Sequence, residues 1–215
     1  MWFHSSTCWL FRSSAPPFDI NQVLIPSESK TLHLYEARYL ALLEEVERLD
    51  VGALVSIRGI GRVKIMEFVQ ADPYLKGIVI PMQDNNSECV SEISSKVSEL
   101  KEALYSLNSL EIKLKAPKEE LLQTCIAKSL TWAEKEPSVD CDEAFVPSLA
   151  ERISFAALQP VTGSTQSELL ELQREKLRAM DVRETLERID DSLQLVRKSI
   201  SMVVAKLAIQ SLEVQ

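Results

Sequence analysis

The sequence predicts an α+β protein, in which a small β-sheet part is followed by a helical bundle with a long last helix. Two observations carry this prediction. The stretch Val51–Pro81 consists of short apolar runs separated by glycine and proline turns, a pattern typical of strands. From Val90 onward, apolar residues recur every three or four positions, as on one face of an amphipathic helix. The expected domains are 18–85 for the sheet and 86–215 for the helices.

Residues 1–17 (MWFHSSTCWLFRSSAPP) differ in composition from the rest of the chain. They contain no acidic residue, a single Arg and several Ser. This composition is that of a short organelle transit peptide, and a disordered segment or an alternative start accounts for it equally well. We expect these residues to lie outside the fold.

Two strands and a helix are expected next. The apolar run Ile20–Ile25 predicts a first strand, which the turn Pro26–Ser29 ends. The segment Lys30–Tyr35 alternates apolar and polar residues and predicts a second strand. Beyond it, Glu36–Leu49 has one apolar face and predicts a helix.

The stretch Val51–Pro81 predicts three strands that form a β-meander. The three apolar runs are Ala53–Ile57, Val63–Phe68 and Gly77–Ile80, the last of which Pro81 should end. Gly59 and Gly61 allow positive φ, so a tight hairpin or a bulge is expected between the first two strands. Asp72-Pro73 is a turn signal before the third strand.

The helical part is expected to begin with Val90–Leu107. The residues 110–114 either extend this helix or form a short strand. Further helices should open at Pro117 and Pro147, because a proline in the first turn of a helix lacks only an N–H that would be unpaired anyway. The segment SELLELQREKLRAM, after Thr162–Thr165, predicts another helix.

The last helix is the clearest element in the sequence. Asp181 and Glu184 have the spacing of an N-terminal capping box. Apolar residues then recur at alternating intervals of four and three, which predicts a continuous seam against another helix. An intramolecular seam is the favoured interpretation, and a homodimer through this helix is the alternative. The seam consists of Val182, Leu186, Ile189, Leu193, Val196, Ile200, Val203 and Leu207.

Four segments, in this order, resemble motifs of the N-terminal, substrate-binding domain of Lon proteases. Leu34–Glu45 is similar to the helix that follows the first strands of that family, and Ile57–Ile65 to its glycine–arginine strand turn. Asp72–Leu75 is similar to its Pro-Tyr-Leu element, and Arg152–Gln159 to its first C-terminal helix. The resemblance covers Ile20 to Leu212. It implies structural roles for Tyr35, Glu36, Arg38, Tyr39, Gly59, Arg62, Pro73, Tyr74 and Leu75.

The resemblance implies a PUA-like β-barrel and a non-catalytic module that binds exposed apolar polypeptide in protein quality control, with a protease complex as a further partner. The resemblance places the chain with plant, plastid-type proteins that carry this domain without the protease. A chloroplast location is therefore expected, with the cytoplasm as the alternative. No catalytic residue, cofactor or metal is implied, and the resemblance does not identify the binding residues.

The chain departs from the family at one point. Relatives carry several dozen residues with further strands after the first helix, whereas here Glu45 runs directly into Val46. The chain therefore looks like a shortened isoform whose barrel lacks strands. Strands without neighbours leave backbone groups unpaired, so an inactive splice remnant is one alternative.

Composition excludes several classes of function. The formal net charge is −8, with acidic and basic residues interspersed, so no cluster follows a nucleic-acid backbone. No apolar run is long enough to cross a bilayer. The four cysteines form no C-x-x-C pair, which makes a structural metal site and disulfides unexpected. A P-loop motif is also missing, so neither ATPase activity nor a cofactor is expected.

One enzymatic alternative remains. Ser27 and Lys30 match the Ser-x-x-Lys pattern of a hydrolase, in which the lysine activates the serine. The pattern is short and occurs often by chance, and the other motifs of that enzyme class are missing. The expected function is therefore non-catalytic, and a Ser-Lys hydrolase is the alternative.

Overall fold

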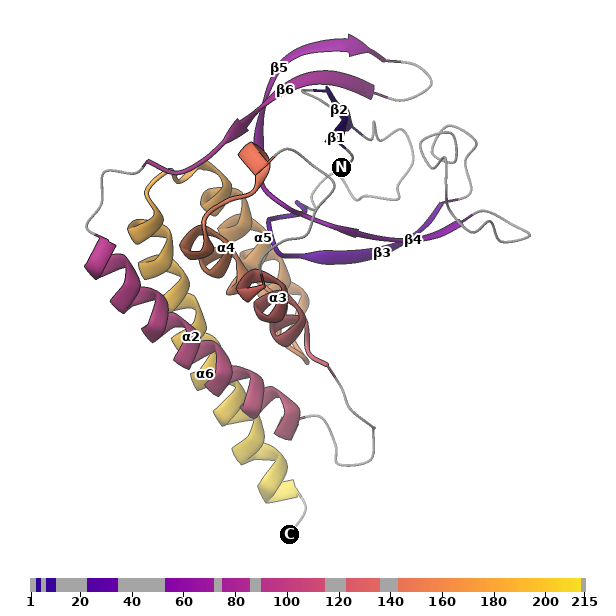
Figure 1. Ribbon diagram of the computed structural model, residues 1–215. Coiled ribbons are helices and arrows are strands. Elements are labelled where there is room, and N and C mark those ends of the chain that lie inside the picture. The colour runs from indigo at the N-terminus through magenta and orange to yellow at the C-terminus, as the bar shows by residue number, and fades with distance from the viewer. Residues whose placement is uncertain are drawn as a thin grey trace. The chain divides into compact units, whose positions relative to one another are not determined.

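The computed structural model confirms an α+β protein (Figure 1). Strands dominate the first part of the chain and helices the second, as the periodicities predicted. The structure describes residues 3–4, 7–10, 23–34, 53–71, 75–85, 90–114, 123–135 and 143–213.

The chain divides into two compact units. The sheet unit comprises Met1–Gln83 and Ser138–Pro147, and the helical unit comprises Asp84–Pro137 and Ser148–Gln215. Each unit is therefore built from two separate parts of the sequence. The short segment 138–147 leaves the helical part of the sequence to join the sheet unit.

The described strands form two antiparallel sheets. One has the order β1-β2-β6-β5, and the other pairs β3 with β4. In the two-stranded sheet, Leu32 and Leu34 are buried, as the alternation predicted. The strands are β1 (Phe3–His4), β2 (Thr7–Leu10), β3 (Ser29–Leu34), β4 (Ala53–Arg58), β5 (Arg62–Gln70) and β6 (Leu75–Met82).

The predicted β-meander is wrong, although its three strands exist. β4 pairs with β3, whereas β5 pairs with β6, so no hairpin joins β4 to β5. The chain changes from one sheet to the other between Gly59 and Gly61. β6 also continues through Pro81 to Met82. The alternation of apolar and polar residues indicated which segments form strands, but it did not indicate which strands pair with one another.

Two other predictions for this unit differ from the structure. Strands β1 and β2 fall within residues 1–17, which were expected to lie outside the fold. Val23, Leu24 and Ile25 form no strand, although one was predicted over Ile20–Ile25. The predicted helix over Glu36–Leu49 lies outside the described residues.

The helices of the second unit follow the predicted order. The residues 110–114 extend α2, which resolves the alternative left open by the sequence. α3 begins at Cys125, later than the predicted opening at Pro117, and the described residues before it, Gln123 and Thr124, are not helical. The helices are α2 (Val90–Leu114), α3 (Cys125–Glu134), α4 (Leu149–Ala156), α5 (Gln166–Asp181) and α6 (Thr185–Glu213).

Side-chain oxygens define where three of these helices start. Thr124, Ser148 and Thr165 each accept a hydrogen bond from a backbone N–H in the first turn of α3, α4 and α5. Thr165 forms a complete capping box with Glu168. The capping box predicted at Asp181 and Glu184 is wrong, because Asp181 is the last residue of α5.

The seam of α6 is buried within the helical unit. α2 and α6 lie side by side (Figure 1), and α4 packs against both. Ile189, Leu193, Val196 and Val203 are at most 2% exposed and belong to one apolar core with Leu100, Leu104 and Leu107 of α2. The seam therefore contacts partners in its own chain, in accord with the favoured intramolecular interpretation.

Candidate functional site

Apolar side chains are exposed along β5 and β6. We call the group Ile65, Met66, Phe68, Val69, Ile78 and Ile80 the β5–β6 surface. Phe68 is 59% exposed, Met66 and Val69 are each 56%, and the other three range from 38% to 45%. Large exposed apolar side chains on two neighbouring strands are candidates for a binding surface.

Both faces of β5 take part in this surface. Successive strand residues point to opposite faces of a sheet, and the residues from Lys64 to Val69 are all exposed. On β6, by contrast, the buried Val79 lies between the exposed Ile78 and Ile80. β5 therefore projects from the unit, whereas one face of β6 is covered.

Two irregularities shape β5. The register with β6 shifts between Ile65 and Glu67 and again between Phe68 and Gln70. Met66 and Val69 are the extra residues at these points. Such bulges bend a strand and increase its twist, and they commonly protect the free edge of a sheet from pairing.

The opposite end of β5 is anchored. Val63 packs against Val79 and Phe145, both of which are buried. The neighbouring Gly61 has no room for a side chain, because an added Cβ would lie 2.2 Å from the carbonyl oxygen of Phe145. Arg62, one of the predicted structural residues, is only 2% exposed. The exposed residues of β5 therefore follow a segment, Gly61–Val63, that close packing holds in place.

Gly59, another predicted structural residue, lies against the turn that contains Ser27. The N–H of Ser27 donates to the Gly59 carbonyl at 2.8 Å, and the Gly59 N–H donates to the Glu28 carbonyl at 3.0 Å. A Cβ at Gly59 would lie 2.1 Å from the Ile25 carbonyl oxygen. The glycine is required for this close backbone approach, and not for the hairpin that the sequence suggested.

The turn at Ser27 is strained. Ser27 has a φ of 70°, in the left-handed region that residues other than Gly, Asn and Asp seldom adopt. The N–H of Glu28 donates to the Ile25 carbonyl at 3.2 Å and closes the turn. Arg58 donates from Nη1 to the Ser27 carbonyl at 3.1 Å. Burial of this guanidinium lowers the pKa of Arg58.

The Ser27–Lys30 pair receives no support from these contacts. Ser27 is fully buried, so a substrate cannot reach its hydroxyl without a rearrangement of the turn. The ammonium of Lys30 lies 4.0 Å from Glu28 Oε1. A nearby carboxylate favours the charged form of lysine, whereas a general base needs the neutral form.

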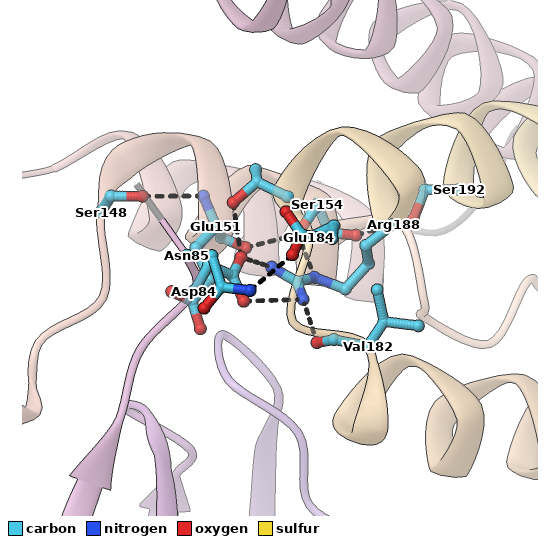
Figure 2. A network of polar contacts seen from close by, with 10 residues as sticks. Asp84, Asn85, Ser148, Glu151, Ser154, Val182, Glu184, Arg188 and Ser192 are labelled. Carbon is cyan, nitrogen blue, oxygen red and sulfur yellow. Dashed lines mark hydrogen bonds and ion pairs between the residues drawn. The ribbon is translucent and has the colours of Figure 1, made fainter. Parts of the chain in front are cut away.

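The helical unit contains a buried polar network around Arg188 (Figure 2). Its guanidinium forms an ion pair with Asp84 and donates from Nε to Ser154 Oγ at 2.8 Å. Nη1 donates to Asp84 Oδ1 at 3.2 Å and to the Val182 carbonyl at 2.9 Å. Most of the five guanidinium donors therefore have partners, as a charge in the protein interior requires.

Neighbouring side chains extend this network (Figure 2). Asn85 Nδ2 donates to Glu184 Oε1, and the Asn85 N–H donates to the Arg183 carbonyl at 3.0 Å. Ser192 donates to the Ser154 carbonyl at 2.9 Å. The Arg188 guanidinium also lies 4.5 Å from the centre of the Phe155 ring, within range of a cation–π contact.

This network accounts for the conspicuous Arg152–Gln159 motif. Ser154 and Phe155 hold Arg188, and Arg152 donates from Nε to the Ala133 carbonyl at 3.0 Å, at the end of α3. A hollow beside Arg188, lined by Leu158 and by residues of α5 and α6, has a volume of about 10 Å³. This hollow has room for one water molecule at most.

Sequence reasoning did not identify the Arg188 network. A signal was present, because Thr185, Arg188 and Ser192 are spaced by three and four and form a polar stripe beside the apolar seam. All three are at most 5% exposed. Polar residues at core-facing positions of a helix indicate a buried network, since they must be paired there.

The remaining predicted site residues lie mostly outside the described part of the chain. Those are Tyr35, Glu36, Arg38, Tyr39, Pro73 and Tyr74. Leu75 starts β6, where its backbone pairs with that of Leu10. Of the predicted structural residues, Gly59 lies in a close backbone contact, and Arg62 has a buried side chain on β5.

Comparison with known protein families and with curated proteins finds no match for this sequence. Within the described residues, no helix is long and apolar enough to span a membrane. No group of His, Cys, Asp or Glu in that part of the chain is arranged to hold a metal ion.

Proposed function

We propose that this chain is a non-catalytic polypeptide-binding module of the Lon N-terminal type, which holds apolar segments of other proteins in protein quality control. The β5–β6 surface is the observation that carries the proposal. A protease complex is the proposed larger partner, and the chloroplast, or alternatively the cytoplasm, the proposed location.

The chemistry of the β5–β6 surface suits an extended, apolar ligand. Each apolar side chain that a ligand covers contributes about 25 cal/mol per Å² of area removed from water. Lys64 and Glu67 are exposed and lie directly opposite Ile80 and Ile78 on the neighbouring strand, so they add charged groups to the contact. Apolar side chains exposed along two strands favour broad recognition of unfolded segments over recognition of one particular sequence.

The arrangement of the strands supports an incomplete PUA-like barrel as the scaffold. The described strands form two separate small sheets, as expected if connecting strands are absent. The strands that would flank β5 in a complete barrel would cover part of its apolar surface. Shortening of the chain would therefore enlarge the binding surface at the expense of stability.

Binding of fluorescein-labelled β-casein, an unfolded protein, tests this function by fluorescence anisotropy. Replacing Phe68 with Ser should weaken casein binding at least about fivefold, because the side chain is largely exposed and contributes to the contact. The matched control is Leu170→Ser on α5, where the side chain is 52% exposed and lies in the other unit. Equal affinities of these two variants, or no binding by the original chain, would contradict the proposal.

The same preparation distinguishes binding from catalysis. The purified chain should hydrolyse neither ATP nor casein, since the sequence contains neither a phosphate-binding motif nor the full set of motifs of a serine hydrolase. Casein cleavage that persists through purification and disappears in a Ser27→Ala variant would favour the hydrolase instead.

A further inference from the structure

An N-terminal strand occupies one edge of β6. β2 pairs antiparallel with β6, with Thr7 opposite Ile78 and Leu10 opposite Leu75. The sheet order places β2 on the side of β6 away from β5. The β6 edge over Leu75–Ile78 thus accepts an extended segment through its main chain.

The pairing of β2 with β6 involves few residues. β2 has four residues and β1 only two. Strands of two to four residues form few ladder hydrogen bonds, and they open at a low free-energy cost compared with core strands. β2 can therefore leave β6 without unfolding the rest of the unit.

The occupant has the character of an unfolded client segment. Its sequence, TCWL, is uncharged and free of proline, so its backbone can donate to a ladder throughout. Strand addition derives its affinity mainly from main-chain hydrogen bonds, and therefore tolerates many sequences of this kind. The exposed Ile78, at one end of this edge, would contact an apolar side chain of such a segment.

We propose that the β6 edge over Leu75–Ile78 is a strand-accepting site for extended apolar polypeptide, and that Thr7–Leu10 is its tethered competitor. This inference rests on the proposed function in taking unfolded polypeptide as the ligand. A tethered segment has a high effective concentration at its site, so it lowers the apparent affinity for a ligand in solution. The N-terminal segment would restrict binding to clients that pair better than it does.

Hydrogen exchange on the intact chain tests the competition directly. Saturating β-casein should accelerate exchange across Thr7–Leu10, because the client displaces β2. Exchange across Leu75–Ile78 should not rise above its rate without casein, because the client pairs there in place of β2. Adjacent strand residues point their N–H groups in opposite directions, so either Cys8 or Trp9 points its N–H toward β6. Replacing both residues with Pro therefore removes at least one N–H that faces β6. This variant should bind casein at least about threefold more tightly than the original chain.

A peptide in trans separates this inference from the proposed function. The peptide SSTCWLFR, under reducing conditions, should bind the double-proline variant and restore protection across Leu75–Ile78. The same peptide with prolines in place of Cys8 and Trp9 is the control and should not bind. Exchange across β3, which pairs with β4 in the same unit, reports by comparison with the original chain that the sheet unit of the variant is folded.

The outcomes are distinguishable. If casein binds but leaves exchange at Thr7–Leu10 unchanged, the competition is overturned and the proposed function stands. If casein binds to neither chain, the proposed function fails, and the peptide alone then decides whether β6 accepts a strand. A double-proline variant that is folded and binds neither peptide overturns the inference.

Discussion

The carboxylate of Asp84 binds the guanidinium of Arg188, a side chain 104 residues further along the sequence. The exposed fractions of the two side chains are 6% and 1%. Asp84 is the first residue of the helical unit and also accepts a hydrogen bond from the Thr185 hydroxyl at 2.5 Å. The ion pair therefore ties the first segment of this unit to the start of its last helix.

Replacing Asp84 with Ala should lower the free energy of unfolding by about 3–5 kcal/mol, because the Arg188 charge would remain buried without its counterion. Urea unfolding measures the change. The control is Asp190→Ala, which removes the half-exposed partner of Lys96 and should barely change stability. An Asp84 variant as stable as this control would show that water solvates Arg188.

The seam of α6 predicts a contrast between adjacent residues. Leu193 is 2% exposed in the apolar core, so Leu193→Ala should cost about 2–5 kcal/mol of stability. Gln194 is exposed, and Gln194→Ala should leave stability almost unchanged. Equal shifts of the thermal midpoint for the two variants would mean that the seam is not buried.

Gly59 should not tolerate a side chain. Gly59→Ala would place a methyl group against the Ile25 carbonyl, so we expect a loss of about 1–3 kcal/mol as the turn moves away. Exchange at the Ser27 and Gly59 amides should rise in this variant, because they form the bonds across the contact. At Gly163, where φ is +74° and no atom lies within 4 Å of an added Cβ, an Ala costs only the backbone strain and leaves those amides protected.

The capping box predicts a dependence of stability on pH. The backbone hydrogen bond from Thr165 is the main cause that lowers the pKa of Glu168 below its ordinary value. A carboxyl whose pKa is lower in the folded state stabilises the fold above its unfolded pKa and loses this effect as pH falls through its folded pKa. The stability advantage over a Glu168→Gln variant should therefore shrink below about pH 4. A constant difference from pH 7 to pH 3 would contradict the assignment.

Hydrogen exchange should separate the sheet unit from the helices. Exchange should be fast across Val51–Pro81, because the described strands form small sheets and β5 pairs on one side only. It should be slow across Val182–Leu207, where the buried seam lies. A family-length insert between Glu45 and Val46 should slow exchange in the first region alone. Equal protection of the two regions in the original chain would mean that the sheet closes in another way.

Periodicity predicted the helical unit better than the sheet unit. The seam of α6 could be recognised because it depends on the spacing of residues along one helix. The burial of Leu32 and Leu34 could be recognised in the same way, from their alternation along β3. The strands that pair with β4 and β5 could not be predicted, because Gly59 and Gly61 make close contacts with Ile25 and Phe145, which are distant in sequence. The Asp84–Arg188 ion pair was not predicted either, because its two residues are also far apart in the sequence.

The position of Phe145 has a practical consequence for recombinant fragments. Its ring shares a small core with Val63 and Val79, and the Ala144 carbonyl accepts a hydrogen bond from Gln83 Nε2 at 2.8 Å. A gene fragment that stops at Gln83 would encode every strand described here and would still omit this part of the core. Separate expression of the two units therefore requires a rearranged coding sequence for each. In the first, a linker joins residues 138–147 to the end of the fragment 1–83. In the second, a linker joins residue 137 to residue 148.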